Sequence, residues 1–183
     1  SVDAVKDFAE KLGWPVIAED PLTFENATSH ASVFITSKTI ADDLAPDTVV
    51  VIGRTTLSRS INAFIKMARK QIVIDPRMAT VDTERMADQK FIQLPVVEVQ
   101  PADAEYGEKW KKYSLRASKL VSDISTWSEQ LVAREIAAGV PTGTALFISS
   151  SRPIRDLEGF AVARTGVETF ANRGLAGIDG NIS

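Results

Sequence analysis

The run TVVVI at Thr48–Ile52 constrains the fold of this chain more than any other segment. All five residues are β-branched, and such side chains favour extended backbone because their restricted χ1 torsion suits a pleated surface. Four of the five are apolar, so neither face of the strand is suited to water. This pattern is typical of a strand inside a parallel sheet that is covered by helices on both faces.

A turn, a helix and a second strand follow this first strand. Gly53 turns the chain, and apolar residues then recur at helical spacing over 57–68. A second apolar run follows at Gln71–Ile74, and Asp75 and Pro76 end it. A strand, a helix and a strand in this order form a βαβ unit, which places two parallel strands in one sheet. We therefore predict an α/β fold with a Rossmann-like, mainly parallel sheet flanked by helices.

The rest of the chain continues the alternation of strands and helices. The same patterns predict helices at 2–12, 105–124 and 127–138, and strands at 14–19, 90–94, 96–99, 144–148 and 167–170. We expect a central Rossmann-like domain at 1–101 that lacks its first strand. Residues 102–183 are expected to form linker helices and the N-terminal part of a second α/β domain. The pattern begins inside a helix and stops at a glycine-rich turn, so we expect an excised piece of a longer protein.

Composition and charge exclude several classes of function. The formal net charge is −3, whereas a general nucleic-acid binder needs a basic face against the phosphates. The chain has no cysteine and a single histidine, His30, which excludes disulfides, thiolate zinc sites and sites with several histidines. His30 stands in a polar stretch, so we predict a loop histidine rather than a catalytic base. No apolar run reaches the roughly 20 residues of a membrane span, and we expect a cytoplasmic protein.

The segment NRGLAGIDG at Asn172–Gly180 is the most discriminating motif. It supplies three glycines directly after a predicted strand, so its backbone can turn sharply and approach a ligand closely. The first amides of a following helix, together with Arg173, would favour an anion. On spacing alone, an ordinary strand-to-helix loop explains the segment equally well.

A second motif precedes this segment, and the pair carries a family resemblance. Ser-x-x-x-Arg at Ser151–Arg155 comes before the Asn-Arg-Gly-x-x-Gly-Ile-Asp-Gly pattern at Asn172–Gly180. Together they resemble the family of 2-succinyl-5-enolpyruvyl-6-hydroxy-3-cyclohexene-1-carboxylate synthases, within the thiamine-diphosphate superfamily. Leu12–Val16 and Val49–Arg54 resemble the central domain of that superfamily less specifically. The resemblance covers nearly the whole chain and is strongest at its end.

The resemblance implies an enzyme of menaquinone biosynthesis. It would decarboxylate 2-oxoglutarate and add the resulting succinyl carbanion equivalent to isochorismate, with thiamine diphosphate and Mg²⁺ as cofactors of a homodimer or homotetramer. Residues 102–183 would then begin the diphosphate-binding domain. The resemblance also implies that Ser151, Arg155 and Arg173 bind substrate, and the planar guanidinium of arginine suits a carboxylate.

The cofactor-binding motifs of that superfamily are missing from this sequence. Neither the glutamate that activates the aminopyrimidine nor the Gly-Asp-x…Asn segment that holds the diphosphate and magnesium is present. Asp179-Gly180 does not match that metal motif. We therefore assign no catalytic, cofactor-binding or metal-binding residue, and we expect the fragment by itself to be inactive.

Two arginines follow the two strands of the βαβ unit. Arg54 comes after Thr48–Ile52 and Arg77 after Gln71–Ile74, and ligands of open α/β sheets bind at the carboxyl ends of the strands. We hypothesise a regulatory anion site at these arginines for a carboxylated downstream metabolite, such as a naphthoate. Surface arginines that pair with neighbouring carboxylates are the simpler explanation.

Two further functions are compatible with the pattern. A stand-alone nucleotide- or dinucleotide-binding α/β module is the first, although Gly53–Thr56 supplies one glycine where the dinucleotide fingerprint needs three. A non-enzymatic interaction domain is the second, if the charged helix predicted at 105–124 mediates assembly.

Overall fold

The computed structural model describes residues 2–77, 86–96 and 103–172. The chain forms two compact units: unit 1 comprises 1–14 and 35–107, and unit 2 comprises 15–34 and 108–183. Segment 15–34 thus belongs by packing to the unit that contains the C-terminal part of the chain, which a single boundary near residue 101 does not anticipate. The predicted domain limits themselves stay a prediction.

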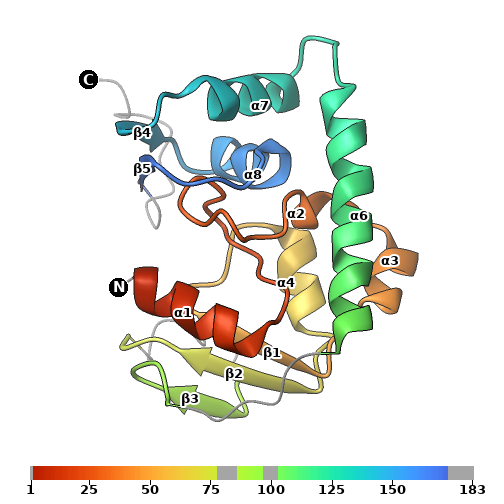
Figure 1. The fold of residues 1–183 in the computed structure, drawn as a ribbon, viewed down its shortest axis with the longest axis vertical. Helices are drawn as coiled ribbons and strands as arrows, with labels where there is room; N and C mark the ends of the chain where they lie inside the picture. Colours follow the sequence, from red (N-terminus) through yellow and green to blue (C-terminus); the bar gives the residue numbers. More distant parts are fainter. Residues whose placement is uncertain (1, 78–85, 97–102, 173–183) are drawn as a thin grey trace. The chain divides into compact units, whose positions relative to one another are not determined.

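Unit 1 is built on a parallel three-stranded sheet. Its strands are β1 (Thr48–Ile52), β2 (Lys70–Ile74) and β3 (Gln89–Phe91), in the order β1-β2-β3 (Figure 1). Among its described residues, unit 1 also contains the helices α1 (Val2–Leu12), α3 (Lys38–Asp43) and α4 (Arg59–Ile65). Helix α4 connects β1 to β2, and these strands pair in parallel, so the predicted βαβ unit is confirmed.

Local chemistry explains where α4 begins and which face it buries. The Ser58 hydroxyl accepts a hydrogen bond from the Ile61 N–H at 3.4 Å, which caps the first turn. Ile61 and Phe64 lie three residues apart, hence on one face of the helix, and both are buried. In β1 and β2, residues Ile52 and Ile74 are register partners, so both strands end at the same edge of the sheet.

Unit 2 contains the second half of the fold. Its strands β4 (Thr144–Ile148) and β5 (Val167–Ala171) pair in parallel, and α8 (Arg152–Phe160) connects them. Helix α7 (Glu129–Gly139) packs against α8, as does the short α2 (Ala31–Phe34) (Figure 1). The long helix α6 (Ala104–Ser122) begins in unit 1 and continues into unit 2.

The core of unit 2 draws on segments that are far apart in the sequence. Its buried residues come from the loop before α2, from α7, from α8 and the residue that follows it, and from β5: Leu22, Ala137, Leu157, Ala161 and Val167, with Val140, Leu146 and Ile148 packed against them. Leu22 is fully buried, so the loop before α2 is an integral part of this core. That contribution explains why segment 15–34 belongs to unit 2.

The strand predicted at 14–19 is wrong. No strand forms there; the Val16 carbonyl instead accepts a hydrogen bond from the Thr28 N–H at 2.7 Å, which closes a loop. The Pro21 carbonyl accepts from the Arg164 N–H at 2.8 Å. Short apolar runs do not by themselves distinguish a strand from another buried segment, and here the backbone partners come from loops.

Most other predicted elements are confirmed with small shifts in their bounds. Helices α6 and α7 and strands β4 and β5 lie where the periodicity predicts them, whereas β3 spans only Gln89–Phe91. The short helices α2 and α3 were not predicted. The strand predicted at 96–99 lies almost entirely outside the described residues. Within the described part of the chain, no helix is both long and apolar enough to cross a membrane.

Candidate functional site

The carboxyl edge of the β4–β5 sheet brings the two sequence motifs together. Ile148 and Ala171 are register partners, so the residues that follow each strand lie at the same edge. The Asn172 side-chain oxygen accepts a hydrogen bond from the Ser150 N–H at 2.6 Å, across 22 residues of sequence. The first residue of the second motif, Asn172, therefore lies beside the residue that precedes the first motif, Ser150. Arg173, predicted to bind substrate, lies outside the described residues.

Ser151 has an unusual backbone conformation for a residue with a side chain. Its φ is 76° and its ψ is −121°, at the turn from β4 into α8. Such sparsely populated conformations cost about 1–3 kcal/mol and persist only where surrounding contacts enforce them. The Ser151 side chain is exposed and makes no capping hydrogen bond to α8, so its hydroxyl is presented to solvent at the helix N-terminus. No local sequence pattern signalled this conformation.

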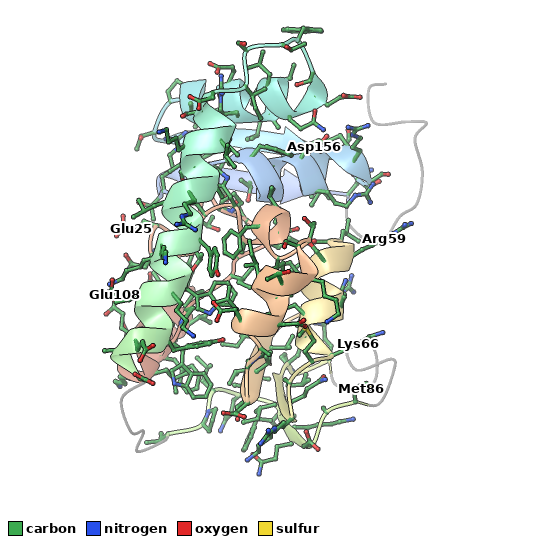
Figure 2. All side chains as sticks on the ribbon, turned by 90° about the vertical axis from the view of Figure 1, so that its right-hand side faces the viewer. Glu25, Arg59, Lys66, Met86, Glu108 and Asp156 are labelled. Atoms are coloured by element: carbon green, nitrogen blue, oxygen red, sulfur yellow. The ribbon has the colours of Figure 1, made fainter. Side chains whose placement is uncertain are left out.

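Helix α8 separates a buried face from a charged face. Ile154 and Leu157 are buried, whereas Arg155 is exposed and available to a ligand at the same end of the helix as Ser151. The neighbouring Arg152 is already engaged, because it donates to Asp156 at 3.1 Å; Asp156 is labelled on α8 in Figure 2. Arg155 is therefore the more accessible of these two arginines of α8, and its guanidinium is suited to an anionic group.

An apolar groove of about 750 Å³ lies beside this edge, within unit 2. It is bounded by α7, β4 and α8, and Val132, Ile136, Leu146 and Phe147 contribute to its walls. The side chain of Trp127 lines the groove and is 83% exposed, although a side chain as large and apolar as tryptophan is usually mostly buried.

His30 is buried, which the prediction of a loop histidine did not anticipate. It occupies the turn before α2 with φ 63°, yet it is only 1% exposed. Its Nδ1 lies 2.8 Å from the Gly159 carbonyl oxygen; a carbonyl only accepts, so Nδ1 carries the proton. Burial lowers the pKa of His30, and this outweighs the opposing effect of the Gly159 hydrogen bond. His30 therefore contributes a buried hydrogen bond to unit 2, and the prediction that it is not a catalytic base stays a prediction.

The two arginines of the hypothesised anion site lie at the carboxyl ends of β1 and β2, as predicted, and Asp75 lies with them. Arg77 donates to Asp75 through Nε at 3.0 Å and Nη2 at 2.7 Å, and the Arg77 backbone N–H donates at 2.6 Å. The Asp75 side chain is 1% exposed, whereas that of Arg77 is 54% exposed. Arg54 is exposed and follows Gly53, whose φ is 81°.

The charges around Asp75 hold it in the ionised form. The side-chain hydrogen bonds from Arg77 lower the pKa of Asp75, and the nearby positive charge of Arg54 contributes in the same direction, against the opposing effect of burial. Arg77 therefore forms an ion pair with Asp75 through two side-chain hydrogen bonds in this structure. An external anion would have to share Arg77 with Asp75, while Arg54 would be directly accessible.

The described residues supply no metal centre. Over 2–77, 86–96 and 103–172, no three His, Cys, Asp or Glu side chains gather into a cluster that could hold a metal ion. Arg54 and Arg155 are exposed charged side chains at the two strand edges described above, and guanidinium groups of this kind are suited to bind carboxylates.

Comparison with known proteins identifies similar sequences. Residues 1–148 match the model of a protein family described as the middle domain of thiamine pyrophosphate enzymes. The chain is 28% identical to a 2-succinyl-5-enolpyruvyl-6-hydroxy-3-cyclohexene-1-carboxylate synthase of Bacillus cytotoxicus over 204 residues, covering 100% of this chain and 35% of that protein. It is 30% identical to the synthase of the same name from Thermobifida fusca over 184 residues, covering 94% of this chain and 32% of that protein.

A third relative gives the same picture. The synthase of Listeria innocua is 28% identical over 201 residues, covering 97% of this chain and 34% of that protein. The chain thus spans about a third of the length of the curated relatives that it matches. The resemblance inferred from the two motifs is confirmed, and so is the predicted fold class.

Proposed function

The chain belongs to the family of middle domains of thiamine pyrophosphate enzymes, and from this premise we propose that it is a piece of a synthase of menaquinone biosynthesis. The whole enzyme decarboxylates 2-oxoglutarate and adds the succinyl carbanion equivalent to isochorismate, in the cytoplasm and as a homodimer or homotetramer. The names of the relatives and the paired motifs at 151–156 and 172–180 support this proposal.

The hydrogen bond between Asn172 and Ser150 is the observation that carries the proposal. It brings the beginning of one motif to the beginning of the other, at the edge where open α/β sheets bind their ligands. Both substrates carry several carboxylates and need fixed donors. The Arg155 guanidinium offers two parallel N–H donors, and the Ser151 hydroxyl offers a third donor beside them. Arg173 joins this set in the proposal.

Among the described residues, no three His, Cys, Asp or Glu side chains gather into a cluster that could hold a metal ion. In this proposal, thiamine diphosphate and Mg²⁺ bind to other parts of the whole enzyme, because the cofactor motifs of the superfamily are missing from this sequence. Thiamine diphosphate supplies the carbanion chemistry when it is bound. The residues of this chain bind and orient the carboxylates of the substrates.

The open β4–β5 sheet supports a role within a larger protein. Parallel sheets are normally covered on both faces, and a sheet of two strands is marginal on its own. Phe147 and Phe170 are register partners, and they are 57% and 49% exposed. This uncovered aromatic pair and the neighbouring apolar groove are surfaces that further polypeptide of a longer enzyme would bury.

A pair of arginine substitutions in the full-length enzyme tests the substrate site. Arg155→Ala is expected to lower kcat/KM about 10- to 100-fold, because a charge-assisted hydrogen bond to a carboxylate is lost. Arg116→Ala, which removes an exposed arginine from α6, serves as the matched control and is expected to leave kcat/KM unchanged. Equal kinetics of the two variants would exclude Arg155 from substrate binding.

The 183-residue chain by itself is expected to be inactive. It should neither decarboxylate 2-oxoglutarate nor join it to isochorismate when thiamine diphosphate and Mg²⁺ are added. Calorimetric titration should show no heat of cofactor binding. Measurable carboligation by the isolated chain would overturn this part of the proposal.

The regulatory anion site at Arg54 and Arg77 extends the proposal. A carboxylate such as a naphthoate would bind the exposed Arg54 first and compete with Asp75 for Arg77. Arg54→Ala in the full-length enzyme is then expected to weaken binding of a naphthoate carboxylate and its inhibition about 10-fold. Arg69→Ala is the control, since Arg69 is 88% exposed in the same unit and pairs loosely with Asp47 at 3.7 Å. Unchanged inhibition in Arg54→Ala would dismiss the site.

A further inference from the structure

Asn172 is the first residue of the second motif, and the resemblance assigns no role to its side chain. It directly follows β5, and its side-chain oxygen lies 2.6 Å from the Ser150 nitrogen. A backbone N–H only donates, so the oxygen of the carboxamide, and not its nitrogen, faces Ser150. The side chain thus ties the carboxyl end of β5 to the loop that follows β4.

The loop that Asn172 holds contains the strained backbone of Ser151. A residue with φ 76° and ψ −121° relaxes to a more populated conformation unless neighbouring contacts fix it. Ser151 gains no such restraint from its own side chain, which makes no capping hydrogen bond. The hydrogen bond from the Ser150 N–H to Asn172 therefore restrains the loop directly beside the strained residue Ser151.

The amide of asparagine also suits the charge of the site. An aspartate could accept the same hydrogen bond from Ser150, but its negative charge would repel substrate carboxylates. A neutral acceptor fixes the loop without this repulsion. Asparagine is therefore better suited than aspartate to position 172, because it holds the loop without adding a negative charge beside an anion site.

We propose that Asn172 is a positioning residue, which holds the Ser150–Ser151 loop so that the Ser151 hydroxyl and the Arg155 guanidinium reach one substrate carboxylate together. This inference rests on the proposed function for its ligand. Asn172 acts through Ser151 and makes no contact with substrate of its own in this scheme.

A double-mutant cycle in the full-length enzyme tests the coupling. Asn172→Ala is expected to lower kcat/KM about tenfold, because Ser151 is no longer held. Ser151→Gly removes the hydroxyl and tolerates the positive φ. If Asn172 acts through Ser151, adding Asn172→Ala to the Ser151→Gly variant should lower kcat/KM less than about twofold, because the effects of coupled substitutions do not add. Equal losses in both backgrounds would overturn the proposal and leave a merely structural role.

Asn172→Asp separates geometry from charge. It keeps an acceptor oxygen, so hydrogen exchange of the peptide that contains Ser150 should stay as slow as in the wild type and become faster only in Asn172→Ala. Its KM should nevertheless rise about fivefold or more with kcat little changed, because the added charge opposes the substrate carboxylate. Fast exchange in Asn172→Asp or unchanged exchange in Asn172→Ala would contradict the assigned hydrogen bond.

The Arg155→Ala variant distinguishes failure of the proposed substrate site from failure of the positioning role of Asn172. If Arg155→Ala retains full kcat/KM, the proposed substrate site fails, while the exchange experiment still reports on the loop. If Arg155→Ala is impaired but the cycle is additive, the substrate site stands and only the positioning role of Asn172 is refuted.

Discussion

The single histidine makes the stability of this chain depend on pH in a way that can be worked out from its surroundings. His30 is 1% exposed, and its Nδ1–H donates to the Gly159 carbonyl at 2.8 Å. Its Nε2 has no hydrogen-bond partner among the described residues. Protonation at Nε2 would place an unpaired charge in the interior, and burial accordingly lowers the pKa of His30.

The sign of the effect follows from proton linkage. In the unfolded chain the imidazole has its ordinary pKa of about 6.5, and in the folded chain the pKa is lower. Between these two values the unfolded state binds more protons, so acid favours unfolding. The contribution of His30 to the free energy of unfolding should be constant above about pH 7.5 and then fall as the pH drops below 6.5, by at most about 1.4 kcal/mol per pH unit.

Urea unfolding at pH values from 5 to 8 measures this slope, and His30→Asn is the matched variant. Asparagine tolerates the positive φ of this position, and its amide can donate to the Gly159 carbonyl, but it does not titrate. The variant is expected to be about 1–3 kcal/mol less stable at pH 7.5. Its free energy of unfolding should no longer fall between pH 7 and 5.5 through the titration of residue 30. The same slope in both proteins, or a wild type that is more stable at pH 5.5 than at 7.5, would refute the reasoning.

Three other substitutions give simple stability predictions for urea or thermal unfolding. Gly166→Ala should lower stability by about 1–3 kcal/mol, because Gly166 has φ 94° and an added Cβ would lie 2.6 Å from the Thr142 Cγ2 atom. Gly139→Ala should instead raise stability by about 0.5 kcal/mol, since Gly139 is helical with nothing within 4 Å of an added Cβ; a loss comparable to that of Gly166→Ala would contradict the clash argument. Ser128→Ala should cost about 1 kcal/mol, because the Ser128 hydroxyl accepts from the Leu131 N–H and caps α7; an unchanged midpoint would exclude that cap.

The strands of both sheets were predictable because their signals are local. The β-branched run at Thr48–Ile52 and the apolar run at Gln71–Ile74 each have to be covered on both faces, and the helical spacing between them leaves a crossover as the natural connection. The same kind of local pattern also predicted β4 and β5. It failed at 14–19, where the residues are half-buried and the Val16 carbonyl accepts its hydrogen bond from the Thr28 N–H of a loop rather than from a neighbouring strand.

The candidate site was predicted only in its residue types. The motifs supplied Ser151 and Arg155, and parallel pairing of β4 with β5 brings their loop to the edge where the second motif begins. The strained backbone of Ser151 and the hydrogen bond from Ser150 to Asn172 carry no local sequence signal. Each depends on how two strand ends are placed by the rest of unit 2.

The run at Thr48–Ile52 and its partners therefore determined the α/β class and the parallel sheet, because hydrophobic periodicity encodes which faces must leave water. Tertiary structure alone decided that the loop at 15–34 joins unit 2 and that His30 is buried against Gly159 across 129 residues. The physical reason is that such side-chain contacts depend on distances between elements. No periodicity within one element specifies those distances.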